Sequence, residues 1–200
     1  MFTGLVEEMG TVRKITRRHG SVTFLVEGKK TGRSLKANDS IAVDGVCLTV
    51  IRRTKAVFEV QAVEETLKKT TLGRLSVSSK VNLERPLTGN GRMGGHFVLG
   101  HVDGIGWVDK IVRRKSSWMY WIKVPRSQRK FLIPVGSVAV NGVSLTVAAL
   151  KTDRFGVSII PHTWRVTTFR TLKTGDPVNI ECDMLGKYVD QLLHARRGRR

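Results

Sequence analysis

Two short segments of the chain share one pattern but differ at a position where chemistry depends on the side chain. DSIAVDGVCLTV (residues 39–50) and GSVAVNGVSLTV (residues 136–147) are identical at eight of twelve positions. The first segment carries Cys47 where the second carries Ser144. A thiol and a hydroxyl of similar shape differ in acidity and polarizability, so a site built at both positions would be chemically unequal. From these residues alone, a small buried core residue is the commoner role for a free cysteine.

A histidine is the second candidate for chemistry. His101 lies between apolar residues in LGHVDG (residues 99–104), and the aligned position in the first copy holds Leu5. An imidazole titrates near neutral pH and suits proton transfer, although a lone histidine among apolar neighbours is more often structural. His96 is a weaker candidate, which we expect to order the segment between the copies. No group of histidines and cysteines has the spacing of a zinc site, so the sequence predicts no metal.

The shared pattern extends over nearly the whole chain. GLVEEMGTVRKI (residues 4–15) matches GHVDGIGWVDKI (residues 100–111) at six of twelve positions. A third block, residues 66–84, matches residues 163–181 at Thr, Thr-Thr, Leu and Val-Asn-x-Glu. The offset between the copies is 96 residues for the block that begins at residue 4, and 97 residues for the blocks that begin at residues 39 and 66. A period of this length is too long for a solenoid unit and indicates a duplicated domain.

Each repeat is rich in strand signals. Short β-branched and aromatic runs such as SVTFLVEG, VFEVQAV, WMYWIKV and FGVSIIP are typical of strands. Asp44-Gly45 and Asn141-Gly142 lie between apolar runs and predict tight hairpin turns. Several short strands in each repeat favour a small closed barrel, because closure removes exposed edges. Short helical turns are expected over residues 64–69 and 127–131.

The end of the chain has helical periodicity instead. In DMLGKYVDQLLHARR, spacings of three and four residues place one set of side chains on or beside a single helix face: Leu185, Tyr188, Val189, Leu192, Leu193 and Arg196. An amphipathic helix attached to a β protein must bury its apolar face, and a partner subunit is the expected cover. We therefore predict three parts, namely a first repeat over residues 1–96, a second over residues 97–184, and a helix with a basic tail over residues 185–200.

Composition and charge narrow the class of protein. With 35 Lys and Arg against 16 Asp and Glu, the formal net charge is +19, and the basic residues lie in short bursts without interleaved aromatic residues. Such bursts favour a solvated surface over a specific nucleic-acid site. Two cysteines make no disulfide framework, which favours a reducing cytosol. Residues 131–150 hold no charge but contain Pro, Gly and Asn, so we expect buried strands around a turn and no membrane span.

A set of motifs in fixed order points to a family. MFTGLVEE, GVCLTV, GGHFVLGHVDG, GVSLTV and IIPHTW together resemble the riboflavin synthase family of the α-chain type, over about residues 1–190. The resemblance implies an all-β fold of two tandem six-stranded Greek-key β-barrels with a C-terminal amphipathic helix that assembles a homotrimer. It implies that two molecules of 6,7-dimethyl-8-ribityllumazine dismute to riboflavin and 5-amino-6-(ribitylamino)uracil, the last step of riboflavin biosynthesis, without metal or cofactor. It also implies a cytoplasmic protein that associates with lumazine synthase.

The resemblance further assigns residues to a site between the first barrel of one subunit and the second barrel of another. It implies catalytic roles for Phe2, Thr3, Cys47 and His101. It places substrate contacts at Gly4, Leu5, Val6, Cys47, Leu48, Thr49, Gln61, Ala62, Val63, Glu64, Glu65, Thr66, Gly100, His101, Val102, Val135, Ser144, Leu145, Thr146, Ser158, Ile159, Ile160, Pro161, His162, Thr163 and Asp183. Residues 61–66 and 158–163 are expected to hold the ribityl chains, because polyols need many donors and acceptors. For Asp183, a solvated acid before the terminal helix is the competing interpretation.

A duplicated pocket suits a reaction that joins two copies of one substrate, because each copy must be bound and the two must face each other. Since the products differ, the pockets should be unequal. We expect Cys47, Thr3 and the N-terminal segment to form one side of the pair, and Ser144 with Asp183 the other. One departure from the family is Val135, which stands where a lysine is often found. A charged contact from that position is absent.

Two other functions stay open as alternatives. A non-catalytic lumazine or flavin binder of the same fold, like the antenna proteins of luminescent bacteria, should have eroded part of the motif set. Here MFTG, Cys47, His101, Ser144 and Thr146 are all present. A nucleic-acid-binding barrel is suggested only by the net charge and predicts exposed aromatic residues beside the basic bursts. Incubation of the protein with the lumazine, followed by measurement of riboflavin fluorescence, distinguishes the enzyme from these two alternatives.

Overall fold

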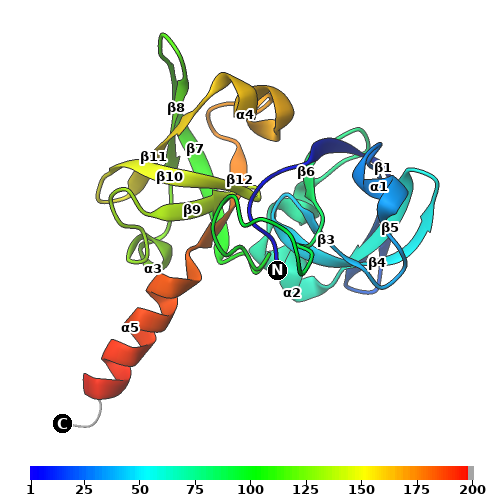
Figure 1. Ribbon diagram of the computed structural model, residues 1–200, viewed down its shortest axis with the longest axis horizontal. Coiled ribbons are helices and arrows are strands. Elements are labelled where there is room, and N and C mark those ends of the chain that lie inside the picture. The colour runs from blue at the N-terminus through cyan, green and yellow to red at the C-terminus, as the bar shows by residue number, and fades with distance from the viewer. Residues whose placement is uncertain (198–200) are drawn as a thin grey trace.

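The computed structural model describes residues 1–197, which form two closed β-barrels side by side and a helix that extends away from the second barrel (Figure 1). The first barrel closes in the order β1-β2-β5-β4-β3-β6, and its neighbouring strands pair antiparallel. Its strands are β1 (Glu8–Arg18), β2 (Ser21–Glu27), β3 (Ser40–Val43), β4 (Val46–Thr54), β5 (Val57–Ala62) and β6 (Lys80–Glu84).

The second barrel repeats the arrangement of the first. It closes in the order β10-β11-β8-β7-β12-β9. Its strands are β7 (Gly104–Arg113), β8 (Trp118–Lys123), β9 (Ser137–Val140), β10 (Val143–Leu150), β11 (Arg154–Ile159) and β12 (Pro177–Cys182). Two tandem six-stranded antiparallel barrels with a terminal helix confirm the fold class that the sequence predicted.

Two equivalent hairpin turns define the register of the strands that carry Cys47 and Ser144. Asp44 and Gly45 have φ values of +46° and +77°, and Asn141 and Gly142 have φ values of +47° and +77°. Positive φ at both central residues is the type I′ pattern, whose twist matches that of antiparallel strands. The two predicted hairpins are therefore confirmed. The uncharged residues 131–150 include β9 and β10 around the second turn, as expected.

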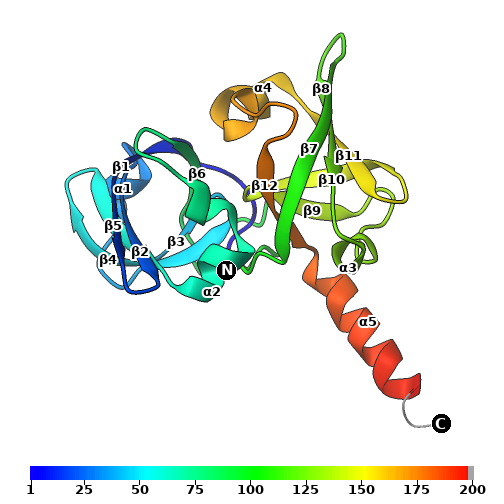
Figure 2. The ribbon, with the colours of Figure 1, turned by 180° about the vertical axis from the view of Figure 1, so that it is seen from behind.

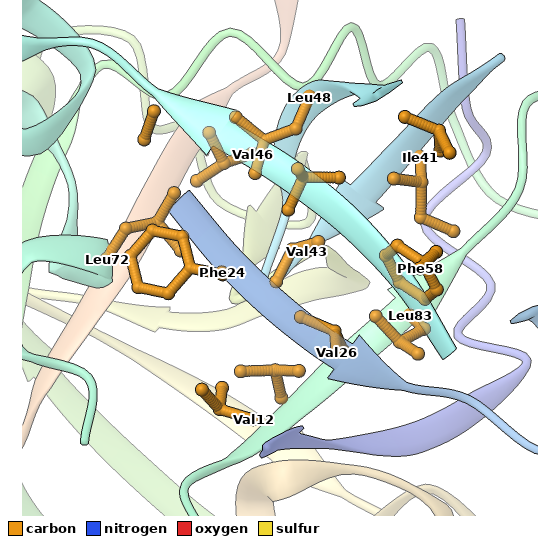
Figure 3. Close-up of a cluster of buried hydrophobic side chains, with 14 of the residues drawn as sticks. Val12, Phe24, Val26, Ile41, Val43, Val46, Leu48, Phe58, Leu72 and Leu83 are labelled. Carbon is orange, nitrogen blue, oxygen red and sulfur yellow. The ribbon is translucent and has the colours of Figure 1, made fainter. Parts of the chain in front are cut away.

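Each barrel encloses its own apolar core. The residues of β2 alternate between half-buried and buried, as a strand with one face inside a barrel requires. The first core contains Val12, Phe24, Val26, Ile41, Val43, Val46, Leu48, Phe58, Leu72 and Leu83 (Figure 3). An equivalent cluster in the second barrel includes Tyr120, Phe155 and Phe169. Because both interiors are filled by side chains, a substrate site has to lie outside the barrels or where they meet.

The barrels meet through equivalent residues of the two repeats. The Asn82 side-chain amide donates to the backbone carbonyl of Asn141 at 2.9 Å, and that of Asn179 donates to the carbonyl of Asp44 at 2.8 Å. The Asp44 carboxylate accepts from the backbone N–H of Asn82 at 2.8 Å, and the Asn141 side-chain oxygen accepts from that of Asn179 at 2.7 Å. An acid in one repeat and an amide in the other thus fill the same place.

The contact between the barrels is also close in backbone terms. A Cβ added to Gly45 would lie 2.5 Å from the backbone nitrogen of Gly142, so no side chain fits there. Asp44 beside it is buried, and burial raises the pKa of its carboxyl group to about 7, opposed by the hydrogen bond from Asn82. The first repeat therefore carries a titratable group at the interface where the second repeat carries none.

Most helices are a single turn or two. α2 (Glu64–Lys69) and α4 (Pro161–Val166) follow the fifth strand of each barrel and lead into the 3-10 turns η1 (Thr71–Arg74) and η2 (Thr168–Arg170). α1 (Thr31–Ser34) and α3 (Arg126–Arg129) lie in the connections before β3 and β9. α2 confirms the turn predicted over residues 64–69. The turn predicted over residues 127–131 is α3, which begins one residue earlier and ends two residues earlier.

α5 (Met184–Arg197) projects from the second barrel (Figure 2). Ion pairs of 2.6 Å join Lys187 to Asp103 and Lys130 to Asp190 and fix its first half to the barrel. Between 55% and 66% of each apolar side chain on its outer face is exposed, at Leu185, Tyr188, Val189, Leu192 and Leu193. Of the expected basic tail, residues 198–200 and the side chains of Arg196 and Arg197 lie outside the described residues. In residues 1–197, no helix is long and apolar enough to span a bilayer.

Candidate active site

The segments that open the two repeats lie between the barrels and pair with each other. We call residues 2–6 the first strap and residues 98–102 the second strap. The backbone N–H of Phe2 donates to the carbonyl of Val98 at 2.7 Å, and that of Val98 donates back to Phe2 at 3.2 Å. Phe2 is fully buried against Ala42 and Ala139, one from each barrel. The N-terminus accordingly lies between the barrels in Figure 1.

Each strap crosses to the barrel of the other repeat. The backbone N–H of Cys47 in β4 donates to the carbonyl of Gly100 in the second strap at 3.0 Å. The backbone N–H of Ser144 in β10 donates to the carbonyl of Gly4 in the first strap at 2.8 Å. Gly4 and Gly100 have φ values of +77° and +78°, and a Cβ on them would lie 2.5 Å from Ser144 Cβ and 2.6 Å from Cys47 Cβ. Only glycine permits this conformation and this approach.

A buried glutamate holds each strap in place. Glu84 accepts from the backbone N–H groups of Thr3 at 2.8 Å and Gly4 at 3.0 Å, and from the Thr3 hydroxyl at 2.9 Å. Glu181 accepts from the backbone N–H groups of Leu99 at 2.7 Å and Gly100 at 3.0 Å. Burial raises the pKa of both carboxyl groups, opposed by these hydrogen bonds. Both oxygens of each carboxylate are used, so the straps are fixed on two sides.

The second strap and the first barrel enclose a pocket of about 170 Å³. Cys47 is half-buried there and His101 is exposed beside it. The remaining lining residues are Val46, Glu65, Thr66, Lys69, Thr70, Gly100 and Val102. A thiol, an imidazole and a carboxylate thus border one opening, and they come from both repeats. This arrangement can hydrogen-bond a polar ring and transfer a proton at its edge.

The expected grouping of the two straps was wrong. The sequence predicted that Thr3 and the N-terminal segment would share a side with Cys47, but Gly4 bonds to Ser144, and the segment beside Cys47 carries His101. The cause is the crossing of the straps, which exchanges the opening segments between the repeats. A repeat alignment pairs equivalent residues but does not say onto which barrel a segment folds.

At the equivalent place on the second barrel, Ser144 has a histidine partner. His96 Nδ1 lies 2.7 Å from Ser144 Oγ, and His96 is buried, with its Nε2 lacking a partner among the described residues. Burial lowers the pKa of His96, opposed by the nearby Asp183. His96 therefore orients the Ser144 hydroxyl in addition to ordering the segment between the repeats, which was its expected role. Leu5, the counterpart of His101, is 50% exposed and lines a cavity with first-repeat residues such as Leu35 and Glu84.

Asp183 serves the terminal helix. One of its carboxylate oxygens accepts from the backbone N–H of Leu185 at 3.0 Å, at the first turn of α5. This contact agrees with the expectation of an acid before the helix. The effect of the Asp183 carboxylate on the pKa of His96 agrees with a position near Ser144. The two interpretations of Asp183 are therefore compatible, because the helix begins beside the second strap's anchor, Glu181.

The other predicted residues fall into exposed and buried sets. Three of them point into the barrel cores, so only their backbone groups can face a ligand: Leu48, Ala62 and Ile159. Exposed or half-buried positions on β4, β5, α2 and their counterparts are Thr49, Gln61, Val63, Glu64, Glu65, Thr66, Leu145, Thr146, Ser158, Ile160, Pro161, His162 and Thr163. Glu65 and Thr66 lie in the first-barrel pocket, and α4 places His162 and Thr163 at the equivalent positions.

Val135 lies in the loop between α3 and β9. It has a φ value of +62° and is 82% exposed. Its backbone N–H donates to the carbonyl of Val147 at 3.0 Å, and within residues 1–197 no backbone hydrogen bond joins it to either strap. A β-branched residue with positive φ is strained.

Sequence reasoning missed Glu84 and Glu181. Both end the repeated Val-Asn-x-Glu motif, so the repeat itself contained the signal. The repeated glutamate is a weak signal, because a carboxylate at the end of a strand is ordinarily solvated. Only the fold shows that the straps cover both carboxylates. Both cysteines are free, and burial raises the pKa of Cys182 to about 12, so its thiol stays protonated. Among residues 1–197, no three His, Cys, Asp or Glu side chains gather as they would around a metal.

Comparison with known proteins agrees with the duplicated architecture. The lumazine binding domain family matches the chain twice, over residues 3–86 and 99–183. Riboflavin synthase of Bacillus amyloliquefaciens is 45% identical over 97% of this chain and 90% of its own length. Riboflavin synthase of Mycobacterium bovis is 39% identical over 98% of this chain and 99% of its own length.

Solved structures of a second kind of protein share the fold. LumP complexed with 6,7-dimethyl-8-(1'-D-ribityl) lumazine superposes with a TM-score of 0.83, and LumP complexed with riboflavin with 0.85. Each is 25% identical and covers 91% of this chain and 99% of its own. The sequence is thus more similar to the synthases than to this binding protein. Two lumazine binding domains, each completed by a strap from the other, and identities of 39–45% over nearly the full length show that the chain belongs to the riboflavin synthase family.

Proposed function

We propose that this enzyme converts two molecules of 6,7-dimethyl-8-ribityllumazine to riboflavin and 5-amino-6-(ribitylamino)uracil. The observation that carries the proposal is the pair of equivalent sites with unequal side chains, Cys47 with His101 and Ser144 with Leu5. A dismutation needs two sites for one substrate, and different products need sites that differ. Bringing two bound reactants together can supply roughly 7–11 kcal/mol of barrier lowering without a cofactor.

In this proposal, the straps bind the flat heterocycle of the substrate through backbone hydrogen bonds. Residues 4–6 and 100–102 offer backbone N–H and carbonyl groups at the pocket edges, which match the amide edges of a lumazine. Phe2 and Thr3 act by anchoring the first strap, since Phe2 is fully buried and the Thr3 hydroxyl is bonded to Glu84. Residues 61–66 and 158–163 comprise the ends of the equivalent strands β5 and β11 and the residues after them, and they hold the ribityl chains through their polar groups.

His101 is the proposed proton-transfer group. It is exposed at the rim of the first-barrel pocket, where an imidazole can take a proton from the acidic 7-methyl group of the lumazine. Cys47, half-buried in the same pocket, hydrogen-bonds or polarises the ring. Ser144 with His96 supplies the equivalent polar contact for the second molecule.

The active site is completed between subunits of a homotrimer in this proposal. A pocket of about 170 Å³ is small beside the roughly 300–1,000 Å³ of a typical ligand site, so a second surface has to cover the substrate. His101 and Leu5 are exposed in the single chain, as residues at such a junction would be. The uncovered apolar face of α5 supports assembly through the helix.

The domain limits, cellular place and further partners follow from the same family membership. We place the first repeat at residues 1–96, the second at 97–184 and the assembly helix and tail at 185–200. Two free cysteines are consistent with a reducing cytoplasm. Association with lumazine synthase rests on the family resemblance alone.

Turnover tests the reaction. Protein treated with EDTA should convert the lumazine to riboflavin, measured by riboflavin fluorescence and product chromatography. Tight binding of the lumazine without product would favour a binding protein of the LumP kind. Loss of activity that zinc or magnesium restores would contradict a reaction without metal.

Truncation tests the assembly. Deletion of residues 185–200 removes the apolar face of α5, so light scattering should report smaller species and activity should fall, because each site would lose its second surface. The variant Lys187→Ala, which loses an ion pair to the barrel but keeps the apolar face, should keep the assembled size. A fully active monomer after truncation would refute a site shared between chains.

A further inference from the structure

Glu84 and Glu181 hold the straps with both carboxylate oxygens, and each lies at the end of the last strand of its barrel. They are 6% and 5% exposed. Neither borders the Cys47 pocket, and Glu84 lines a separate cavity together with Thr3 and Leu5 of the strap that it holds. Their effect on the site has to pass through the straps.

The direction of that effect follows from the crossing. Glu181 belongs to the second barrel, but the strap that it holds bonds to Cys47 on the first barrel. Glu84 belongs to the first barrel, but its strap bonds to Ser144 on the second. We infer that Glu84 and Glu181 are positioning residues that act crosswise, each setting the site on the opposite barrel. The inference deepens the proposed function and rests on it for the identity of the ligand.

A carboxylate is needed at these positions because every group facing it is a donor. Glu84 accepts on one oxygen from Thr3 and on the other from Gly4, and Glu181 accepts likewise from Leu99 and Gly100. Glutamine would keep one oxygen and turn an NH₂ group toward the remaining backbone N–H. Two donors would then face each other in a buried place, and one strap amide would lose its partner.

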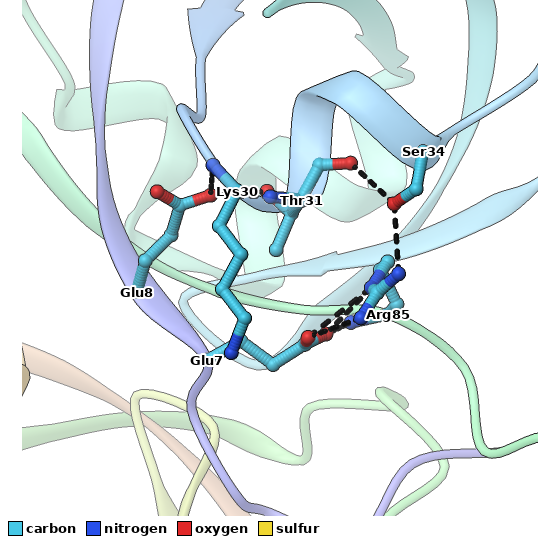
Figure 4. Close-up of polar contacts among 6 residues, drawn as sticks. All are labelled: Glu7, Glu8, Lys30, Thr31, Ser34 and Arg85. Atoms are coloured by element: carbon cyan, nitrogen blue, oxygen red, sulfur yellow. Dashed lines mark hydrogen bonds and ion pairs between the residues drawn. The ribbon is translucent and has the colours of Figure 1, made fainter.

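Glu8 serves as a control for the exchange of glutamate for glutamine, because it holds a segment away from the straps with only one of its oxygens. Glu8 accepts from the backbone N–H groups of Lys30 at 2.9 Å and Thr31 at 2.6 Å, and from the Thr31 hydroxyl at 2.8 Å (Figure 4). Unlike Glu84, Glu8 accepts all three bonds on one oxygen, Oε1, and the segment that it holds leads into α1 and makes no hydrogen bond to either strap within residues 1–197. Because glutamine keeps one carbonyl oxygen for these three donors, Glu8→Gln should leave residues 30–31, both sites and the turnover intact.

Amide hydrogen exchange on the full chain, followed by mass spectrometry, tests the crosswise action. Glu181→Gln should speed exchange at least about tenfold, equivalent to 1.4 kcal/mol of local stability, at Leu99, Gly100 and Cys47, with Ser144 unchanged. Glu84→Gln should do so at Thr3, Gly4 and Ser144, with Cys47 unchanged. If each variant instead affects only its own barrel, or both affect Cys47 and Ser144 equally, the inference is overturned.

Kinetics supply the second readout. Glu181→Gln displaces His101 and should lower kcat more than it raises KM, whereas Glu84→Gln displaces residues 4–6 and should mainly raise KM. Equal losses in both parameters for both variants would contradict crosswise positioning. The exchange result is independent of turnover, so an inactive unaltered protein would refute the proposed function alone. Should a glutamine variant not fold, the shorter Glu181→Asp and Glu84→Asp keep the charge and must show the same crosswise pattern with smaller changes.

Discussion

The sites on the two barrels share a frame and differ in what the frame presents. In both, a glutamate holds a strap, a glycine with positive φ brings the strap against a strand, and a backbone hydrogen bond joins the two. The first-barrel site presents Cys47 and His101, and the second-barrel site presents Ser144, with Leu5 at the position of His101 on its strap.

The comparison shows where divergence was tolerated. Positions that shape the backbone are the same in both repeats, because a Cβ at either strap glycine would meet the neighbouring strand at 2.5–2.6 Å. Side chains that do not set the backbone path differ, both at exposed positions such as Leu5 and His101 and at the buried turn positions Asp44 and Asn141. Substitutions that make the sites alike, or that remove a difference between the repeats, therefore measure what each difference does.

The largest effect is expected from His101→Leu, which makes the second strap match the first. Loss of a general acid–base group should lower kcat by about 10²–10⁴-fold, while the exposed position should keep stability within about 0.5 kcal/mol. Steady-state turnover and urea unfolding measure the two quantities. The reverse change, Leu5→His, should not rescue the loss, because it places the imidazole on the strap that bonds to Ser144 and not on the strap beside Cys47. A His101→Leu enzyme within twofold of the unaltered rate would remove the proposed role.

An effect on stability is expected from Asp44→Asn, which makes the first hairpin match the second. Burial raises the pKa of Asp44 to about 7, above the roughly 3.9 of an unfolded chain. The folded state therefore favours the protonated acid, and the stability present below about pH 4 is lost as the pH rises through about 7. Asp44→Asn should remove this dependence and at pH 8 stabilise the protein by up to about 4 kcal/mol.

Urea unfolding between pH 4 and pH 8 checks this prediction. The two proteins should be equally stable near pH 4 and diverge above it. Asn141→Asp should introduce a similar dependence into the second repeat, since its side chain fills the equivalent place. Parallel stability curves for Asp44→Asn and the unaltered chain would show that the acid is ionised at no cost in the folded state.

The smallest effect is expected from Cys47→Ser, which makes the first strand match the second. A single polar contact is altered, worth about 0.5–1.5 kcal/mol, so kcat should fall by about 2–12-fold with folding and ligand binding preserved. Ser144→Cys is the mirror variant and should also weaken the contact with His96. Turnover and fluorescence titration of riboflavin measure both. An unchanged turnover rate in Cys47→Ser would show that the thiol contributes only to packing.

Local patterns predicted much of the fold, and they failed where segments exchange partners. The hairpins at Asp44-Gly45 and Asn141-Gly142, the turn of α2 and the terminal helix each follow from a few adjacent residues. The candidate residues Cys47 and His101 stood out in the same way, and the fold brings them together at one pocket. Which strap bonds to which strand depends on how the two barrels pack. The residue pattern of a single strand contains no information about that packing.

Buried polar groups were the other gap. Glu84 and Glu181 read as ordinary strand-end acids in the sequence, and their importance comes from the amides that face them. His96 was expected only to order a connecting segment, and the fold adds its contact with Ser144. A sequence lists donors and acceptors but does not pair residues that lie some 50 to 80 positions apart.

The meeting of the barrels through Asn82 and Asn179 bears on the history of the chain. Each asparagine offers the same groups to the other half, as in the isologous interface of a twofold dimer. Such an interface can form between two separate copies of a single repeat, so the tandem chain is equivalent to a dimer joined end to end. In a true dimer every mutation would appear on both sides at once. Covalent joining freed the halves from that constraint and allowed one repeat to carry Cys47 where the other carries Ser144.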